Sequence, residues 1–206
     1  MYEIVLASGS PRRKEILEQV GVEFKVYASD KEEIITKVKP EEIVMELAYV
    51  KAMDVAGKIK DKSIIIGADT MVAIDGQVLG KPENASDARA MLQMLQGNRH
   101  QVYTGVSVII KSDGKFGKEG NKLEDKIINF VEITDVWVYP MKGAQIDRYI
   151  ATEEPFDKAG GYGIQGKFAI NIEKIEGDYY NIVGFPIAKL YSILSEEGID
   201  LLNCRV

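Results

Sequence analysis

The beginning of the chain places an apolar run, a turn of small residues and the start of a helix in immediate succession. Ile4, Val5 and Leu6 form the apolar run, and Ser10 and Pro11 suit the N-cap and first turn of the helix. A strand that passes through a tight turn into a helix N-terminus exposes backbone N–H groups and forms a natural anion site. Strands and helices go on alternating along the chain, which predicts an α/β fold.

Two arginines follow in the first turn of this helix. Arg12 and Arg13 oppose the helix dipole there, so we expect an anion to meet them, and phosphate is the usual partner. The alternative is an ordinary turn with two solvated arginines. This turn has neither the spacing of a Walker loop, which occurs nowhere in the sequence, nor that of a dinucleotide-binding glycine fingerprint.

Hydrophobic patterning divides the rest of the chain into elements. Two adjacent strands within residues 102–139 favour an antiparallel pair and therefore a mixed sheet. The first expected helix turns Ile16, Leu17 and Val20 inward, and the second does the same with Met53 and Val55. The expected strands cover residues 3–7, 22–26, 63–74, 102–110, 127–139 and a segment ending near 175, and the expected helices cover 11–20, a long stretch from 40, 85–97, 143–151 and 186–196.

A second segment of small residues lies within the apolar run 63–74. Gly67 and Ala68 break the run, which would place Asp69 at a strand end, where open α/β sheets bind their ligands. There it would serve as a general base or a metal ligand. The alternative is an aspartate that caps a turn.

Composition limits the class of protein. The 206 residues are 46% hydrophobic, which is enough for one core, and we expect a single domain over residues 1–206. A net charge of −6 argues against a protein dedicated to nucleic acids or membrane surfaces. The one cysteine, Cys204, excludes an intrachain disulfide and fits a reducing compartment. With neither a signal peptide nor a membrane-spanning run expected, we predict a cytoplasmic protein.

Further polar residues favour a nucleotide ligand. Lys51 falls beside the buried face of the long helix, although lysines there often only lay their stems along apolar surface. Lys81 is held in a loop before a proline. The glycine-dense residues 155–166 suit close backbone approach to a ligand, and Gln165 supplies an amide that can read the edge of a base. Such cations and carboxylates suit a triphosphate held with a divalent cation.

A histidine- or cysteine-based mechanism is not expected. His100 is the only histidine, and no Gly-x-Ser-x-Gly nucleophile motif accompanies it. The Cys and His clusters that hold zinc are absent from the sequence.

Seven motifs, in order over nearly the whole chain, resemble the Maf family of nucleoside triphosphate pyrophosphatases. Each motif is a weak signal alone, but the occurrence of all seven in the same order along the chain is specific. They are Ser-Gly-Ser-Pro-Arg-Arg at 8–13, Ala-x-x-Lys-Ala at 48–52, Gly-Ala-Asp-Thr at 67–70, Leu-Gly-Lys-Pro at 79–82, His-x-Val-x-Thr-Gly-Val at 100–106, the glycine-rich stretch 157–166 and Asn-Ile-Val-Gly-Phe-Pro at 181–186.

The resemblance implies an elongated mixed sheet flanked by helices, with two lobes around a central cleft, related to the inosine triphosphate pyrophosphatases. It implies hydrolysis of a nucleoside triphosphate to the monophosphate and pyrophosphate with Mg²⁺ or Mn²⁺. Asp69 falls on the family's proton-acceptor position and on a metal-ligand position. Glu33 lies near the family's second metal-binding carboxylate, and Glu32 is a possible substitute for Glu33 in that role. The positions that fall on phosphate-binding residues are Ser8, Arg12, Arg13, Lys51 and Lys81.

The family divides by substrate. Arg12, Thr70 and Gln165 resemble the branch that acts on dTTP and UTP, rather than the branch that acts on 7-methyl-GTP. The leading interpretation is therefore a house-cleaning hydrolase of non-canonical or surplus pyrimidine triphosphates. Residues 111–126 are a longer surface segment than the family leads us to expect, and could alter a sheet edge or a dimer contact. The sequence leaves open whether the chain forms a homodimer.

Two rival functions stay open at this point. One is a nucleotide-binding regulator of cell division and septum formation without significant turnover. The other is a phosphatase that cuts elsewhere in the phosphate chain. Release of pyrophosphate from UTP and magnesium distinguishes all three.

Overall fold

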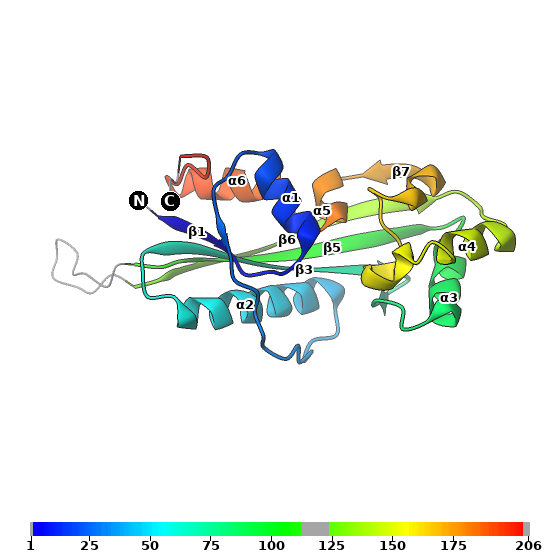
Figure 1. Ribbon diagram of the computed structural model, residues 1–206, viewed down its shortest axis with the longest axis horizontal. Coiled ribbons are helices and arrows are strands. Elements are labelled where there is room, and N and C mark those ends of the chain that lie inside the picture. The colour runs from blue at the N-terminus through cyan, green and yellow to red at the C-terminus, as the bar shows by residue number, and fades with distance from the viewer. Residues whose placement is uncertain (1, 113–123, 204–206) are drawn as a thin grey trace.

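The computed structural model describes residues 2–112 and 124–203. Most of the expected surface segment 111–126, and Cys204, therefore lie outside the described residues. Strands and helices alternate as the sequence predicts (Figure 1). The strands are β1 Glu3–Leu6, β2 Lys25–Val26, β3 Ser63–Ile74, β4 Gln77–Leu79, β5 Arg99–Ile110, β6 Lys126–Val138 and β7 Ile172–Glu176. The helices are α1 Pro11–Gln19, α2 Pro40–Lys58, α3 Ala85–Leu95, α4 Gly143–Ile150, α5 Tyr179–Val183 and α6 Ile187–Glu196, with 3-10 turns η1 Glu154–Asp157, η2 Ala159–Gly161 and η3 Lys167–Asn171.

All the described strands belong to one seven-stranded mixed sheet. Its order is β2-β1-β3-β5-β6-β7, and β4 pairs with β3 through a tight hairpin. β1 runs parallel to β2 and β3, whereas the remaining pairs are antiparallel. The mixed α/β sheet and the antiparallel pair within residues 102–139 are thus confirmed. The long strands β3, β5 and β6 extend through most of the molecule (Figure 1).

Two cores form on opposite faces of one half of the sheet. Successive strand side chains point to opposite faces, so Ile64 and Ile66 pack with α1 and α6, while Ile65 packs with α2. Figure 1 shows α1 and α6 above the sheet and α2 below it.

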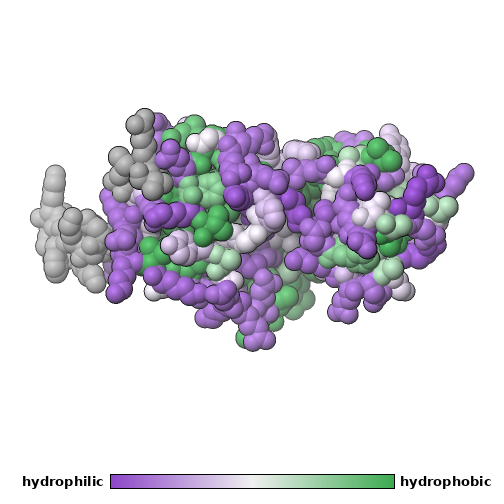
Figure 2. Space-filling view, in the orientation of Figure 1, coloured by the Kyte–Doolittle hydropathy of each residue, from purple (hydrophilic) through white to green (hydrophobic). Residues whose placement is uncertain are grey.

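A separate hydrophobic cluster lies at the other end of the long strands. It joins Leu92 of α3, Val136 of β6 and Tyr149 of α4 to Phe168 of the η3 turn. The molecule therefore has two lobes on one continuous sheet (Figure 1). Hydrophilic residues cover most of the face shown in Figure 2, with hydrophobic patches over both halves. None of the helices in the described part of the chain combines the length and the hydrophobicity that a membrane crossing requires.

Two glycines let α2 lie directly on the sheet. A Cβ at Gly67 would come within 2.4 Å of the carbonyl oxygen of Ala48, and a Cβ at Gly105 within 2.4 Å of the backbone of Val44. The small residues at 67 and 68 therefore mark a close helix approach and not a break in the strand. Asp69 lies in the middle of β3, paired with Gly105, so the expectation of a strand end was wrong.

Several other expectations need correction. Val20 follows the end of α1 and is 36% exposed, because the buried face of that helix is made by Arg13, Ile16 and Leu17. Met53 is 41% exposed on the outer side of α2. The expected strand 22–26 shrinks to the two exposed residues of β2, and the η3 turn precedes β7.

Candidate functional site

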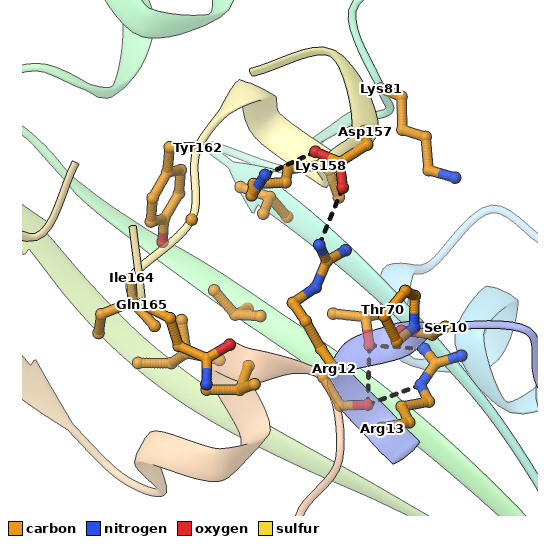
Figure 3. Close-up of a pocket in the computed structure, with 18 of the residues that line it drawn as sticks. Ser10, Arg12, Arg13, Thr70, Lys81, Asp157, Lys158, Tyr162, Ile164 and Gln165 are labelled. Atoms are coloured by element: carbon orange, nitrogen blue, oxygen red, sulfur yellow. Dashed lines mark hydrogen bonds and ion pairs between the residues drawn. The ribbon is translucent and has the colours of Figure 1, made fainter. Parts of the chain in front are cut away.

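A cleft of about 640 Å³ opens between the two lobes. The N-terminal end of α1, the middle of β3 and the turns η1 and η2 form its walls (Figure 3). Of the nine site residues expected from the sequence, every one except Glu33 lines it. Those eight are Ser8, Arg12, Arg13, Lys51, Asp69, Thr70, Lys81 and Gln165.

The carboxylate of Asp69 meets the ammonium of Lys51 inside the cleft. The Lys51 Nζ lies 2.6 Å from Oδ1 of Asp69 and 2.8 Å from Oε1 of Glu33. Asp69 is only 8% exposed, and its burial raises its pKa, although the charge and hydrogen bond of Lys51 oppose the rise. A carboxylate with a raised pKa beside a fixed cation suits a group that takes up a proton during a reaction.

The same two carboxylates can hold a cation. Asp69 and Glu33 already share one positive charge, the Lys51 ammonium, so their oxygens converge on a single point. Among the described residues no three His, Cys, Asp or Glu side chains gather into a metal cluster. Mg²⁺ is commonly bound by one or two carboxylates, with phosphate oxygens and waters completing the shell. The donors therefore fit a cation that arrives with a phosphorylated ligand. Glu33, and not Glu32, makes the ion pair with Lys51.

Arg13 is buried and tightly held. Its Nε donates to the carbonyl of Gly184 at 2.9 Å, Nη1 to Ser8 Oγ at 2.8 Å and Nη2 to Thr70 Oγ1 at 3.1 Å. Burial lowers its pKa from the ordinary arginine value, while the nearby charge of Asp69 opposes the shift. A guanidinium has five N–H groups, so the three bonds leave two N–H groups for a ligand. Ser8 and Thr70 thus orient Arg13, as well as lining the cleft.

Arg12 reaches across the cleft instead of pointing into solvent. Its Nη1 lies 3.0 Å from Oδ2 of Asp157, which also pairs with Lys158 (Figure 3). Burial opposes ionisation of Asp157, but the bonds from Lys158 and Arg12 outweigh it and leave its pKa below the usual value. In this structure Arg12 thus pairs with a carboxylate of the opposite wall, and phosphate binding by Arg12 stays a prediction.

The labelled side chains separate two ends of the cleft. Figure 3 shows Gln165 and Ile164 on one side, with Arg13, Ser10 and Lys81 on the other. Lys81 forms no ion pair with any residue that the structure describes, and the Gln165 amide likewise has no hydrogen-bond partner within that part of the chain. Both remain available to a ligand.

Sequence reasoning missed Glu154 and the contact between Thr104 and Thr70. The Glu154 carboxylate accepts hydrogen bonds from Tyr149 Oη and from the backbone N–H of Lys167, and so ties the end of the glycine-rich segment to α4. An acidic residue directly before Pro155, at the start of that segment, was the available signal. Thr104 lies beside Thr70 as its cross-strand partner, a placement that only the strand register reveals.

His100 has a structural environment, as expected. It is 1% exposed, its Nε2 lies 2.7 Å from Tyr162 Oη, and burial lowers its pKa to about 4. A histidine that stays neutral in a core is not placed for acid–base chemistry at neutral pH.

Comparison with known proteins gives consistent results. The family model described as Maf-like protein matches residues 3–197. A relative from Lachnoclostridium phytofermentans named dTTP/UTP pyrophosphatase is 52% identical and covers 98% of this chain and 99% of its own. Relatives with the same name from Agathobacter rectalis and Bacillus cereus are 47% and 46% identical, and each comparison covers 98% of this chain and 100% of the relative. Among solved structures, the Staphylococcus aureus Ham1 protein is 17% identical, with a TM-score of 0.48 over 95% of this chain and 99% of that one.

Proposed function

We propose, since this chain belongs to the family of Maf-like proteins, that it hydrolyses dTTP, UTP and related pyrimidine triphosphates to the monophosphate and pyrophosphate. Such an activity would clear non-canonical or surplus nucleotides from the cytoplasmic pool. The residues that line the cleft are spread along the chain from Ser8 to Gly184, which supports the view that residues 1–206 act as one domain. A purely regulatory nucleotide binder is not favoured, because the relatives carry the name of an enzyme.

One observation carries the proposal. The buried carboxylate of Asp69 lies in the same cleft as Arg12, Arg13, Lys51 and Lys81. A carboxylate surrounded by cations has little use in a pocket for a neutral ligand. A triphosphate supplies the negative charge that these side chains lack, and hydrolysis supplies a proton for the carboxylate.

The cations divide the work of binding the phosphates. Arg13 offers its two remaining N–H groups from a fixed position, and the N-terminus of α1 adds backbone N–H groups. Lys81 is free to follow the phosphate chain. Arg12 can turn from Asp157 to a phosphate, because an ion pair with 31% and 65% exposed side chains is readily exchanged.

Asp69 is the proposed proton acceptor. It takes a proton from a water molecule as the water oxygen attacks phosphorus. The anhydride bond to the pyrophosphate group then breaks, and its electron pair leaves with the pyrophosphate. The raised pKa of Asp69 makes the carboxylate a better acceptor than an exposed one, and Lys51 keeps it ionised before the attack.

A divalent cation, Mg²⁺ or Mn²⁺, would be held by Asp69 and Glu33 together with the substrate phosphates. When bound, it would offset the negative charge of the phosphate chain. Glu33 is the more accessible ligand, since its side chain is 53% exposed against 12% for that of Asp69. Lys51 would then have to share its two carboxylate partners with the cation.

Base selection is proposed for the other end of the cleft. Uracil and thymine present an acceptor O4 beside a donor N3–H, and the Gln165 amide can pair with both. Arg12 and Thr70 complete the proposed specificity set.

The test is product analysis over a panel of nucleotides. The purified protein is incubated with dTTP, UTP, CTP, ATP and GTP in magnesium buffer, and nucleotide products, pyrophosphate and orthophosphate are quantified separately. The proposal predicts a monophosphate and pyrophosphate in equal amounts, with dTTP and UTP preferred. Orthophosphate with a nucleoside diphosphate would identify a phosphatase instead, and binding without turnover would identify a regulator.

A further inference from the structure

A chain of hydroxyl groups links the cleft to the centre of the sheet. Thr70 of β3 and Thr104 of β5 are direct cross-strand partners, and their Oγ1 atoms lie 3.0 Å apart. Thr104 donates in turn to the backbone carbonyl of Asn181 at 3.0 Å. Thr104 is 0% exposed and does not line the cleft. Its hydroxyl can therefore affect a ligand only indirectly, through Thr70 or through the carbonyl of Asn181, whose following residues 182–184 line the cleft.

The direction of every hydrogen bond in this chain is determined. A carbonyl oxygen can only accept, so the single proton of Thr104 points to Asn181. Thr104 can then only accept from Thr70, and the Thr70 proton is better placed toward Thr104 at 3.0 Å than toward the Gly184 carbonyl at 3.4 Å. Thr70 consequently presents a lone pair, and no proton, to Nη2 of Arg13.

The Thr70 hydroxyl has a second acceptor within reach, the carbonyl of Gly184. The carbonyl of Gly184 lies 2.9 Å from Arg13 Nε and 3.4 Å from Thr70 Oγ1, and its two lone pairs can accept from both. While Thr104 accepts the Thr70 proton, a lone pair of Thr70 is directed at Nη2 of Arg13. Without that acceptor, the Thr70 hydroxyl can turn to Gly184 and withdraw its lone pair from Arg13.

We propose that Thr104 is a positioning residue that orients the Arg13 guanidinium for phosphate binding by fixing the Thr70 proton. The inference rests on the proposed function for the part that Arg13 plays with phosphates. Thr104 itself contacts neither substrate nor the reacting atoms.

The experiment compares isosteric variants. Thr104→Val removes the hydroxyl and keeps the shape, whereas Thr104→Ser keeps the hydroxyl. If Thr104→Val does not fold, Thr104→Cys replaces it, because a thiol is a weak donor of similar size. Thr134→Val is the matched control: Thr134 is equally buried, and its hydroxyl bonds Asp178 and Asn181 but not Thr70.

Three readouts are taken below the unfolding temperature of every variant. They are kcat and KM for dTTP, the dissociation constant of inorganic triphosphate by calorimetry, and the Arg13 Nε–H signal by NMR. For Thr104→Val we expect an approximately ten-fold loss of triphosphate affinity, seen mainly in KM, and a displaced Arg13 signal. Thr104→Ser should restore both, and Thr134→Val should change stability alone.

Either of two results overturns the inference. In the first, Thr104→Val binds triphosphate with the wild-type affinity and leaves the Arg13 signal unmoved. In the second, Thr134→Val loses as much triphosphate affinity as Thr104→Val. The proposed function fails separately, if the wild-type protein releases no pyrophosphate from any nucleotide. The NMR and calorimetric readouts still decide the inference in that case.

Discussion

The ammonium of Lys51 lies 2.6 Å from the carboxylate of Asp69, although the two residues come from different elements. Lys51 belongs to α2 and Asp69 to β3, the strand on which that helix packs. The helix can lie so close because β3 carries a glycine at position 67, where any side chain would meet the backbone of Ala48 and Ala52. The charge pair thus depends on backbone packing.

Removal of the Lys51 charge should move the pH profile of the enzyme. Burial already raises the pKa of Asp69, and Lys51 opposes that rise, so Lys51→Met should raise the pKa further. A general base works only when ionised, so the acid limb of kcat/KM should shift to higher pH. Lys51→Arg, which keeps the charge, should shift it much less. An acid limb that stays in place in Lys51→Met would separate Asp69 from the ionisation seen in the profile.

Gly67→Ala tests the close approach of α2. Its Cβ would lie 2.4 Å from the Ala48 carbonyl oxygen and 2.8 Å from the Ala52 nitrogen, so helix and strand must separate. We expect a loss of about 2 kcal/mol or more in unfolding free energy, together with reduced turnover as Lys51 withdraws. Gly57→Ala is the control, because position 57 of the same helix has open space around it and alanine favours helix. Equal effects from the two variants in denaturant titrations would contradict the packing argument.

Gln165→Glu tests base selection. A carboxylate can only accept, so it would face the O4 of uracil or thymine with a repulsive lone pair. Turnover of UTP and dTTP should fall much more than any residual turnover of purine triphosphates, as measured by kcat/KM for both classes. A uniform fall over all nucleotides would instead assign Gln165 to the phosphates or to the stability of its segment.

His100 should make the stability of the protein depend on pH. Its pKa is lowered by burial from 6.5 to about 4, so the unfolded chain takes up the proton first as the pH falls. The neutral His100 contributes its full share to the unfolding free energy above pH 6.5, and this share is lost as the pH falls from 6.5 to 4. At 1.36 kcal/mol per pKa unit, the loss amounts to about 3 kcal/mol. The unfolding free energy of His100→Gln, measured over this range, should show a flatter slope. A slope equal to that of the wild type would show that other groups cause the dependence.

The sequence led to most of the site because its residues lie in short local patterns. The turn at Ser10, the arginines after Pro11 and the amide at Gln165 are each visible within a few neighbours, and the cleft brings them together. The mid-strand position of Asp69 could not be seen, since Gly67 looks like a strand break until α2 is placed on it.

Other features need tertiary information. The proposed positioning role of Thr104 depends on its pairing with Thr70, and that pairing depends on the register between β3 and β5. The Arg12–Asp157 pair joins residues 145 positions apart in the chain. Sequence patterns identify which side chains carry charge, but not which of them neutralise one another.

Asp69→Asn is the most direct test of the central claim, that a buried carboxylate accepts the proton when a pyrimidine triphosphate is cleaved. The change is nearly isosteric and removes the charge, so the fold should persist, as judged by circular dichroism and thermal unfolding. Pyrophosphate release from dTTP and UTP is then measured under saturating magnesium for both proteins. The account predicts a folded variant whose kcat is lost or reduced by at least a hundred-fold. A folded variant that releases pyrophosphate at the wild-type rate would contradict both the base and the metal-ligand roles of Asp69.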